Sequence, residues 1–141
     1  MSKTFVLDAC ALIAILKNED GADKVAVAYK QAESGEAEII MNRVNLLEVF
    51  YGFYHDKGKE YAEKIMDGIN QSVISITEFD ELLFPEAGRL KASYKISLAD
   101  SIVLSQALAV GGELLTADHH EFDAIEGNEP IVFHWIRRSF L

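Results

Sequence analysis

Short apolar runs alternate with helical segments along this chain, and the alternation limits the folds open to it. Runs of β-branched, aromatic and aliphatic residues predict strands at residues 4–7, 38–41, 73–76 and 113–116, with a further candidate at 131–133. Apolar residues at helical spacing predict helices at residues 9–16, 22–33, 45–54, 60–69, 80–95 and 98–110. Short apolar strands separated by helices typically pair in one direction, so the pattern predicts an α/β fold, a parallel sheet with helices on both faces.

The length and composition are typical of one cytoplasmic domain. The 141 residues are 50% hydrophobic, and no linker, repeat or low-complexity tract divides them, so we predict a single domain over residues 1–141. Asp8 interrupts the apolar run near the N-terminus, and no stretch approaches the ~18 apolar residues of a membrane span. The single cysteine, Cys10, is typical of a reducing compartment. We therefore expect a soluble, cytoplasmic protein that does not bind membranes.

The charge balance excludes one class of nucleic-acid-binding protein. The chain carries 23 acidic and 13 basic residues, for a formal net charge of −10. A protein that coats nucleic acid or an anionic membrane with a basic face has the opposite balance. The acidic residues are the better guide to chemistry, and four of them occupy unusual positions.

Two of these acids follow predicted strands. Asp8 comes directly after the first strand, and Asp118 comes shortly after the fourth. Each has an ordinary structural interpretation, Asp8 as the N-cap of the next helix and Asp118 as a turn former or cap. The alternative is a metal ligand, because ligands of open parallel sheets bind beyond the carboxyl ends of the strands.

The other two acids lie on predicted helices. Glu48 interrupts an apolar stretch, where a buried carboxylate needs a cation, a proton or access to solvent. Its alternatives are a local ion pair with Arg43 or a place on the polar stripe of the helix. Asp100 follows Ser97 at capping-box spacing, which requires no function, but an acid in that first turn also points toward the crevice.

The four acids converge at one edge of the sheet if the strands are parallel. Converging carboxylates repel one another, and a hard cation with oxygen ligands, Mg²⁺ or Mn²⁺, neutralises them. Such a cation, with water in its shell, provides what metal-assisted attack on a phosphodiester requires. The sequence contains no P-loop, GxGxxG or GxSxG motif that would indicate another chemistry.

Around these acids the sequence resembles the PIN-domain ribonucleases, in particular the toxins of VapBC type. The resemblance covers nearly the whole chain and rests on segments 6–12 (VLDACAL), 45–52 (NLLEVFYG), 97–101 (SLADS) and 115–118 (LTAD), followed by Phe122. It implies a three-layer α/β/α sandwich with a mostly parallel sheet of four to five strands. It also implies a catalytic cluster that holds one or two Mg²⁺ or Mn²⁺ ions, formed by Asp8, Glu48, Asp100 and Asp118.

The same resemblance implies an activity and two partners. The activity is endonucleolytic cleavage of single-stranded RNA by metal-activated water, which leaves a 3′-hydroxyl and a 5′-phosphate. The partners are a small antitoxin protein that occupies the site and a second copy of the chain in a homodimer. Cys10 departs from the family pattern, because Ser or Thr is common at that position. Thr116 keeps the hydroxyl that precedes the fourth acid, and Asp123 either supplements the cluster or is a solvated helix position.

A catalytically silent acidic α/β domain that binds a partner is the alternative function. One form of it is a phospho-receiver, which requires an Asp at the end of its third strand and a Lys at the end of its fifth. Here Thr77 and His134 stand at those positions. The other form is a degenerate nuclease, which would lack one of the acids, whereas all four are present. We therefore expect an active enzyme.

Several other residues have two interpretations each. The basic residues that could dock RNA, or simply line solvated surfaces, are Arg89, Lys91, Lys95, Arg137 and Arg138. Helical spacing predicts that Tyr51, Phe53 and Tyr54 pack in the core, with base stacking or a partner surface as alternatives. We interpret His119 and His120 as exposed turn residues rather than zinc ligands, and Cys10 as packing rather than a nucleophile.

Overall fold

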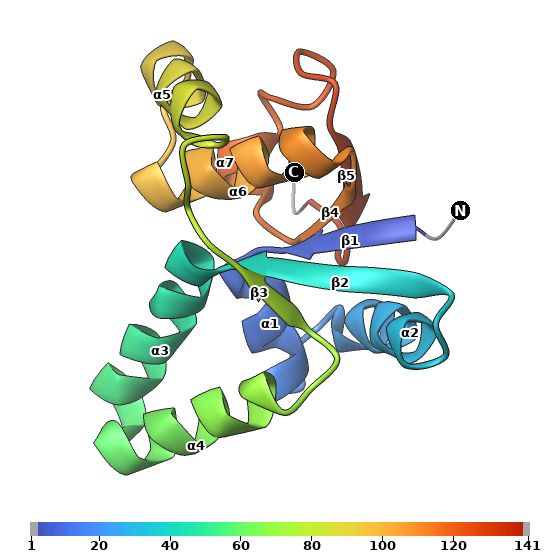
Figure 1. Cartoon of the computed structure of the whole chain (residues 1–141), viewed down its shortest axis with the longest axis vertical. Helices are drawn as coiled ribbons and strands as arrows, with labels where there is room; N and C mark the ends of the chain where they lie inside the picture. The colour runs from blue at the N-terminus through green and yellow to red at the C-terminus, as the bar shows by residue number, and fades with distance from the viewer. Residues whose placement is uncertain (1–2, 140–141) are drawn as a thin grey trace.

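The computed structural model describes residues 3–139 and has a five-stranded sheet at its centre, in the order β3–β2–β1–β4–β5 (Figure 1). The strands are β1 (Lys3–Leu7), β2 (Ala37–Asn42), β3 (Ser75–Thr77), β4 (Glu113–Thr116) and β5 (Val132–Trp135). Every strand pairing in this part of the chain is parallel, and Val6 aligns with Ile40 on one side and Leu114 on the other. The predicted parallel sheet is confirmed.

Helices cover both faces of this sheet, which makes three layers (Figure 1). One face carries α1 (Ala9–Leu16), α2 (Ala22–Glu33), α3 (Arg43–Lys57) and α4 (Lys59–Asn70). The other carries α5 (Phe84–Ser93), α6 (Leu98–Val110) and α7 (His119–Phe122). The α/β/α architecture predicted from the resemblance is therefore confirmed.

Alternating side chains divide the core into two parts, one on each face of the sheet. On β1, Phe5 and Leu7 pack with the helices α1 to α4, whereas Val6 packs with α5 to α7. On β4, Leu115 packs with α1 to α4, and Leu114 packs with α5 to α7. A strand that is buried on both faces has an uninterrupted apolar sequence, which is why these strands are recognisable from sequence.

The order of the strands reverses at β1, and this reversal creates a topological switch point. From β1 the chain builds outward through β2 to β3, then returns to place β4 and β5 on the other side. The connections on the two sides use helices on opposite faces of the sheet. The carboxyl ends of β1 and β4 therefore flank the topological switch point, where open α/β sheets bind their ligands.

The observed boundaries differ from the predicted ones where a capping group or a proline decides them. Helix α3 begins at Arg43 because the side chain of Asn42 caps it, accepting a hydrogen bond from the Val44 N–H. Helix α5 begins at Phe84 rather than residue 80, since Pro85 fits the first turn of a helix but not its interior. Strands β3 and β5 lie one to two residues later than predicted, and the short helix α7 was not predicted.

None of the helices within residues 3–139 is both long and apolar enough to cross a membrane.

Gly21 provides a test of the packing at the start of α2. Its φ is +96°, and an added Cβ would lie 2.6 Å from the carbonyl oxygen of Ile136. Gly35 has a similar φ of +83° but no neighbouring atom within 4 Å of an added Cβ. We expect Gly35→Ala to lower the free energy of unfolding by about 1 kcal/mol through backbone strain alone. Gly21→Ala should cost about 2 kcal/mol more, because the backbone of Ile136 must move. Urea unfolding measures both values, and equal costs would contradict this packing.

Candidate active site

The four predicted acids reach the carboxyl edge of the sheet from four different elements. Asp8 directly follows β1, and Asp118 lies two residues after β4. Helix α3, which carries Glu48, begins at this edge because it directly follows β2. Helix α6 runs back toward the start of β4, so its first turn, with Asp100, lies at the same edge. In Figure 1 this edge is on the left, where α3 and α6 begin.

Asp8 is held in place by hydrogen bonds to both of its carboxylate oxygens. It is only 5% exposed. Its Oδ1 accepts a hydrogen bond from the Ala11 N–H at 2.9 Å, and its Oδ2 accepts one from the Thr116 hydroxyl at 2.5 Å. The same Thr116 oxygen accepts from the Asp118 N–H at 3.0 Å. Asp8 is therefore the predicted N-cap of α1, and Thr116 links its carboxylate to the backbone of the fourth acid.

Cys10 also joins α1 to the end of β4. Its Sγ accepts a hydrogen bond from the Ala117 N–H at 3.2 Å. Burial, together with the negative charge of Asp8, raises the pKa of the thiol to about 12. The thiol is therefore protonated at neutral pH, which supports a packing role over that of a nucleophile.

Burial and repulsion from neighbouring acids raise the pKa values of three carboxyl groups at this edge. The pKa of Asp8 rises to about 6, chiefly through burial and further through the charge of Asp118. The pKa of Asp100 rises to about 7, through burial and then the charges of Asp118, Asp8 and Glu48. The pKa of Glu48 is also raised by burial and by Asp118, although a hydrogen bond from Asn45 opposes the shift. The four acids thus form one electrostatically coupled group.

The capping roles considered from the sequence are confirmed and coexist with this coupling. The side chain of Ser97 accepts a hydrogen bond from the Asp100 N–H at 3.0 Å at the start of α6. The side chain of Asp118 accepts one from the Glu121 N–H at 3.2 Å at the start of α7. A cap fixes the backbone at a helix start, and here the capped turns are the ones that carry Asp100 and Asp118.

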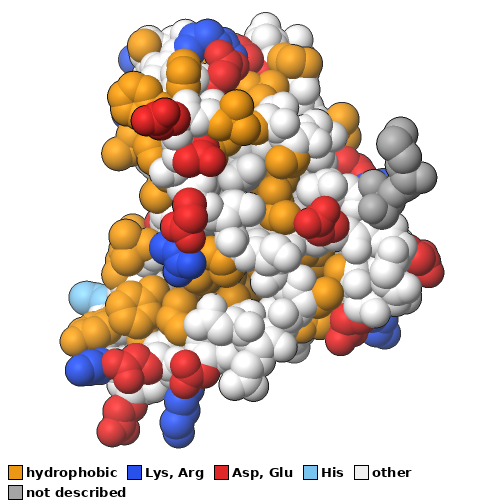
Figure 2. Space-filling view, in the orientation of Figure 1, with side chains coloured by type: hydrophobic (Ala, Val, Ile, Leu, Met, Phe, Trp, Pro, Cys, Tyr) orange, Lys and Arg blue, Asp and Glu red, His pale blue; other side chains and the backbone are white. Residues whose placement is uncertain are grey.

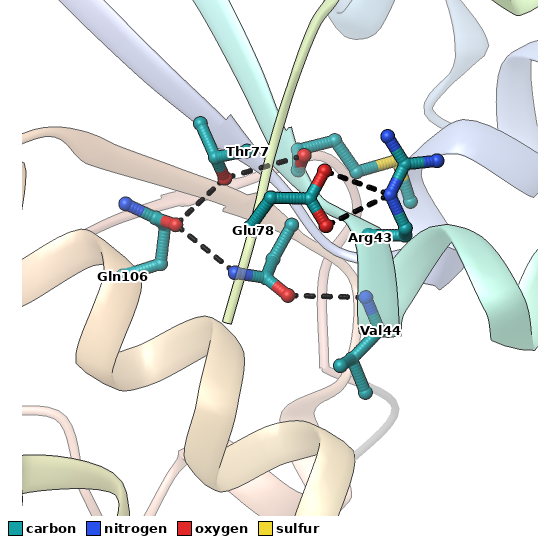
Figure 3. A network of polar contacts seen from close by, with 7 residues as sticks. Arg43, Val44, Thr77, Glu78 and Gln106 are labelled. Carbon is teal, nitrogen blue, oxygen red and sulfur yellow. Dashed lines mark hydrogen bonds and ion pairs between the residues drawn. The ribbon is translucent and has the colours of Figure 1, made fainter. Parts of the chain in front are cut away.

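The alternative interpretation of Glu48 as a partner of Arg43 is wrong. The Arg43 Nε lies 2.8 and 2.9 Å from the two carboxylate oxygens of Glu78, which follows β3 (Figure 3). Glu48 is half-buried, and its Oε1 accepts a hydrogen bond from Asn45 Nδ2 at 3.4 Å. The acid on this apolar stretch is therefore partnered by an amide and not by a cation.

A buried amide network, missed in the sequence analysis, joins the ends of β2 and β3 to α6. The Oε1 of Gln106 accepts hydrogen bonds from Asn42 Nδ2 at 3.2 Å and from the Thr77 hydroxyl at 2.7 Å (Figure 3). Asn42 and Gln106 are both buried. The available signal was the position of Gln106 inside the apolar helix α6, where a buried amide needs partners.

The short helix α7 changes the interpretation of the residues after Asp118. His119 is not an exposed turn residue: its ring stacks on Trp135 with 3.7 Å between centroids, and its Nδ1 lies 2.7 Å from Asp123 Oδ1. His120 is exposed, as predicted. Asp123 is exposed as well, and its carboxylate is paired with His119. Asp123 directly follows α7, so it is solvent-exposed as predicted but lies outside the helix.

Two of the basic residues considered for docking RNA are already paired with acids. Arg89 lies 2.9 Å from Glu86 and 2.7 Å from Glu129, and Arg137 lies 3.7 Å from Glu19. The other three candidates are exposed: Lys91, Lys95 and Arg138.

The aromatic residues of α3 do not all pack in the core. Phe53 is 4% exposed and confirms the prediction, but Tyr51 and Tyr54 are 58% and 46% exposed, so the prediction is wrong for both. Apolar residues occur around most of the circumference of α3, and spacing therefore could not identify the buried side. Figure 2 shows apolar side chains gathered over α3 and α4.

The donor atoms at the carboxyl edge fit a hard cation, although they do not form a closed ligand shell. Within residues 3–139, no three His, Cys, Asp or Glu side chains are arranged closely enough to hold a metal ion. The four acids offer only oxygen donors, the chemistry that Mg²⁺ and Mn²⁺ prefer. The Oδ1 of Asn45 is also buried there without a hydrogen-bond partner. The residues that would hold a cation are Asp8, Glu48, Asp100 and Asp118.

A protein-family model matches most of the chain. The model of the PIN domain family matches residues 5–128. No curated protein sequence matches the chain significantly. The family resemblance inferred from the four acidic segments is thus confirmed by a match that includes them all.

Solved structures with the same fold include proteins of toxin–antitoxin systems. DNA-bound VapBC from Salmonella typhimurium matches with a TM-score of 0.73 at 17% identity. The aligned part covers 97% of this chain and 100% of the VapBC chain. A toxin–antitoxin complex from Klebsiella pneumoniae has a TM-score of 0.69 at 17% identity, covering 95% and 98%. VapC20 from Mycobacterium tuberculosis, described as a sarcin–ricin loop cleaving toxin, has a TM-score of 0.57 at 13% identity, covering 78% and 86%. At these identities the likeness establishes the fold.

Neutralising one acid should stabilise the protein when no metal is present. The pKa of Asp100 is raised from 3.8 to about 7. An acid whose pKa is raised by folding stabilises the folded state at pH values below its pKa in the unfolded chain. This stabilisation is lost as the pH rises through its pKa in the folded protein. We expect Asp100→Asn to raise the free energy of unfolding at pH 8 in EDTA, with the gain disappearing toward pH 4. Urea unfolding at both pH values measures the difference, with Asp67→Asn, an exposed acid on α4, as the control. A gain that is independent of pH, or shared by the control, would contradict the coupling.

Proposed function

The chain belongs to the PIN domain family, and from that premise we propose that it is a metal-dependent endoribonuclease, the toxin of a toxin–antitoxin pair. The observation that carries the proposal is the electrostatic coupling of Asp8, Glu48, Asp100 and Asp118 at the topological switch point. Burying several carboxylates together costs stability, and functional sites are where such a cost is commonly found. The description of the structurally similar VapC20 as a sarcin–ricin loop cleaving toxin supports the choice of a nuclease.

In this proposal the protein supplies placement and charge. Asp8, Glu48, Asp100 and Asp118 would hold Mg²⁺ or Mn²⁺, which would supply Lewis acidity toward a phosphate oxygen and make water a better nucleophile. The Thr116 hydroxyl and the Ala11 N–H keep the carboxylate of Asp8 in one orientation. Four donors on four elements of the sheet and helices form a rigid frame, and rigid placement of reacting groups lowers the barrier to reaction.

The proposal includes two protein partners, an antitoxin and a second copy of the chain. The VapBC and toxin–antitoxin structures that share the fold support the antitoxin. Helices α3 and α4 expose Leu47, Tyr51, Tyr54 and Tyr61, which form an apolar surface. A groove beside it is lined by Arg43, Leu46, Phe50 and Met66. Exposed apolar patches of this kind mark protein interaction sites.

Metal-dependent RNA cleavage tests the proposed activity. A pool of 5′-labelled structured RNAs is incubated with the purified protein in Mg²⁺, in Mn²⁺ and in EDTA. We expect cuts only with metal, and Asp100→Asn should reduce the rate by at least about 100-fold, because even groups outside the ligand shell cost about 10–100-fold. Asp67→Asn serves as the matched control. Absence of cleavage with either metal, despite binding of the metal, would favour the alternative of a silent partner-binding domain.

Replacement of the thiol separates packing from nucleophilic catalysis. Cys10→Ser keeps an acceptor for the Ala117 N–H, which now donates to Sγ at 3.2 Å. Since the raised pKa keeps the thiol protonated, we expect Cys10→Ser to cleave RNA at an unchanged or slightly higher rate, measured in the same assay. An inactive but folded Cys10→Ser protein would show that sulfur takes part in the reaction.

A further inference from the structure

We propose that Asn45 is a positioning residue that holds the carboxylate of Glu48 toward the other acids, an inference that rests on the proposed function. Asn45 lies one turn before Glu48 on α3, so both side chains project from the same face of the helix. It is only 1% exposed. The resemblance to the family assigned it no role.

One amide nitrogen of Asn45 joins the two helices that carry acids. Its Nδ2 donates to Glu48 Oε1 at 3.4 Å and to the carbonyl oxygen of Ala99 at 3.0 Å. Ala99 directly precedes Asp100 in the first turn of α6. A single NH₂ group is therefore hydrogen-bonded both to the Glu48 carboxylate and to the helical turn that carries Asp100.

Glu48 depends on this contact for a fixed position. Within residues 3–139 the hydrogen bond from Asn45 is the only one that its carboxylate makes. The nearest cation on the same helix end, Arg43, is engaged by Glu78. A glutamate has three rotatable side-chain bonds, and without a partner it would sample orientations away from the other acids.

The orientation of the Asn45 amide follows from its neighbours. Both Glu48 Oε1 and the Ala99 oxygen are acceptors, so the NH₂ group must face them. The amide oxygen is then left buried without a donor, and it is one of two such side-chain atoms in the described part of the chain. A buried acceptor without a partner lowers stability. The sequence thus retains a residue that is unfavourable for folding but places an acid.

Other contacts between α3 and α6 do not depend on Asn45. Asn42, which caps α3, donates to Gln106 of α6 at 3.2 Å (Figure 3). A substitution at Asn45 therefore leaves a polar link between the two helices in place. Gln106→Met breaks that link without touching Glu48, which makes it a matched control.

The test compares Mn²⁺ binding with folding stability in Asn45→Leu. Leucine has nearly the same shape and removes both the donor and the unpaired oxygen. We expect unchanged or higher stability in urea without metal, and a Kd for Mn²⁺ raised by about 10-fold or more, the effect of losing a group that orients a ligand. Gln106→Met should lower stability and leave the Kd within about 2-fold, because it does not contact the acids.

A double-mutant cycle shows whether Asn45 acts through Glu48. In the Glu48→Gln background, Asn45→Leu should change the Mn²⁺ Kd by less than about 2-fold, since the carboxylate that it places is gone. Equal losses in both backgrounds, or an unchanged Kd in the single variant, would overturn the role of Asn45 while the metal site stands. Failure of the unsubstituted protein to bind Mn²⁺ would refute the proposed function itself, and with it this role. Asn45→Ser repeats the comparison if the leucine variant does not fold.

Discussion

The buried carboxylate of Asp8 is the interaction on which the geometry of the carboxyl edge depends. Through Ala11 it starts α1, and through Thr116 it reaches β4, the strand on the other side of the switch point. The same threonine oxygen binds the backbone of Asp118, so the ends of β1 and β4 and the start of α7 share one set of hydrogen bonds. Because the group is buried, it must keep these partners, and the ends of the two strands are thereby held in one arrangement.

The acids of this arrangement repel one another electrostatically. The hydrogen bonds lower the pKa of Asp8, but burial and the charge of Asp118 raise it further, to about 6. Burial and the charges of three other acids likewise raise the pKa of Asp100. In a protein selected for stability alone, these acids would be protonated, farther apart or replaced by other residues. In the proposed function a bound cation would relieve this crowding, and the same charges that destabilise the apoprotein would then provide free energy for binding metal.

Sequence analysis predicted the sheet, most of the helices and the helix caps because each depends on a local pattern, whereas the metal-binding role of the four acids stays a prediction. Apolar runs such as residues 5–7 are buried on both faces, and Asp8, Ser97 and Asp118 occupy positions where caps are expected. What it could not predict depends on contacts between distant segments. Arg43 pairs with Glu78 rather than Glu48 because β3 lies beside β2, which no spacing within α3 reveals.

The net charge of −10 constrains how such a protein could bind RNA. Several of its arginines form ion pairs with acidic residues of the chain, among them Arg43, Arg89 and Arg137. Long-range attraction to phosphate is therefore weak, and repulsion is the default. In the proposed function the strongest positive charge available to a phosphodiester would be the cation at the carboxyl edge. RNA binding and phosphate activation would then depend on the same ion, so an apoprotein would neither cleave RNA nor hold it, and non-specific binding to cellular RNA would remain low.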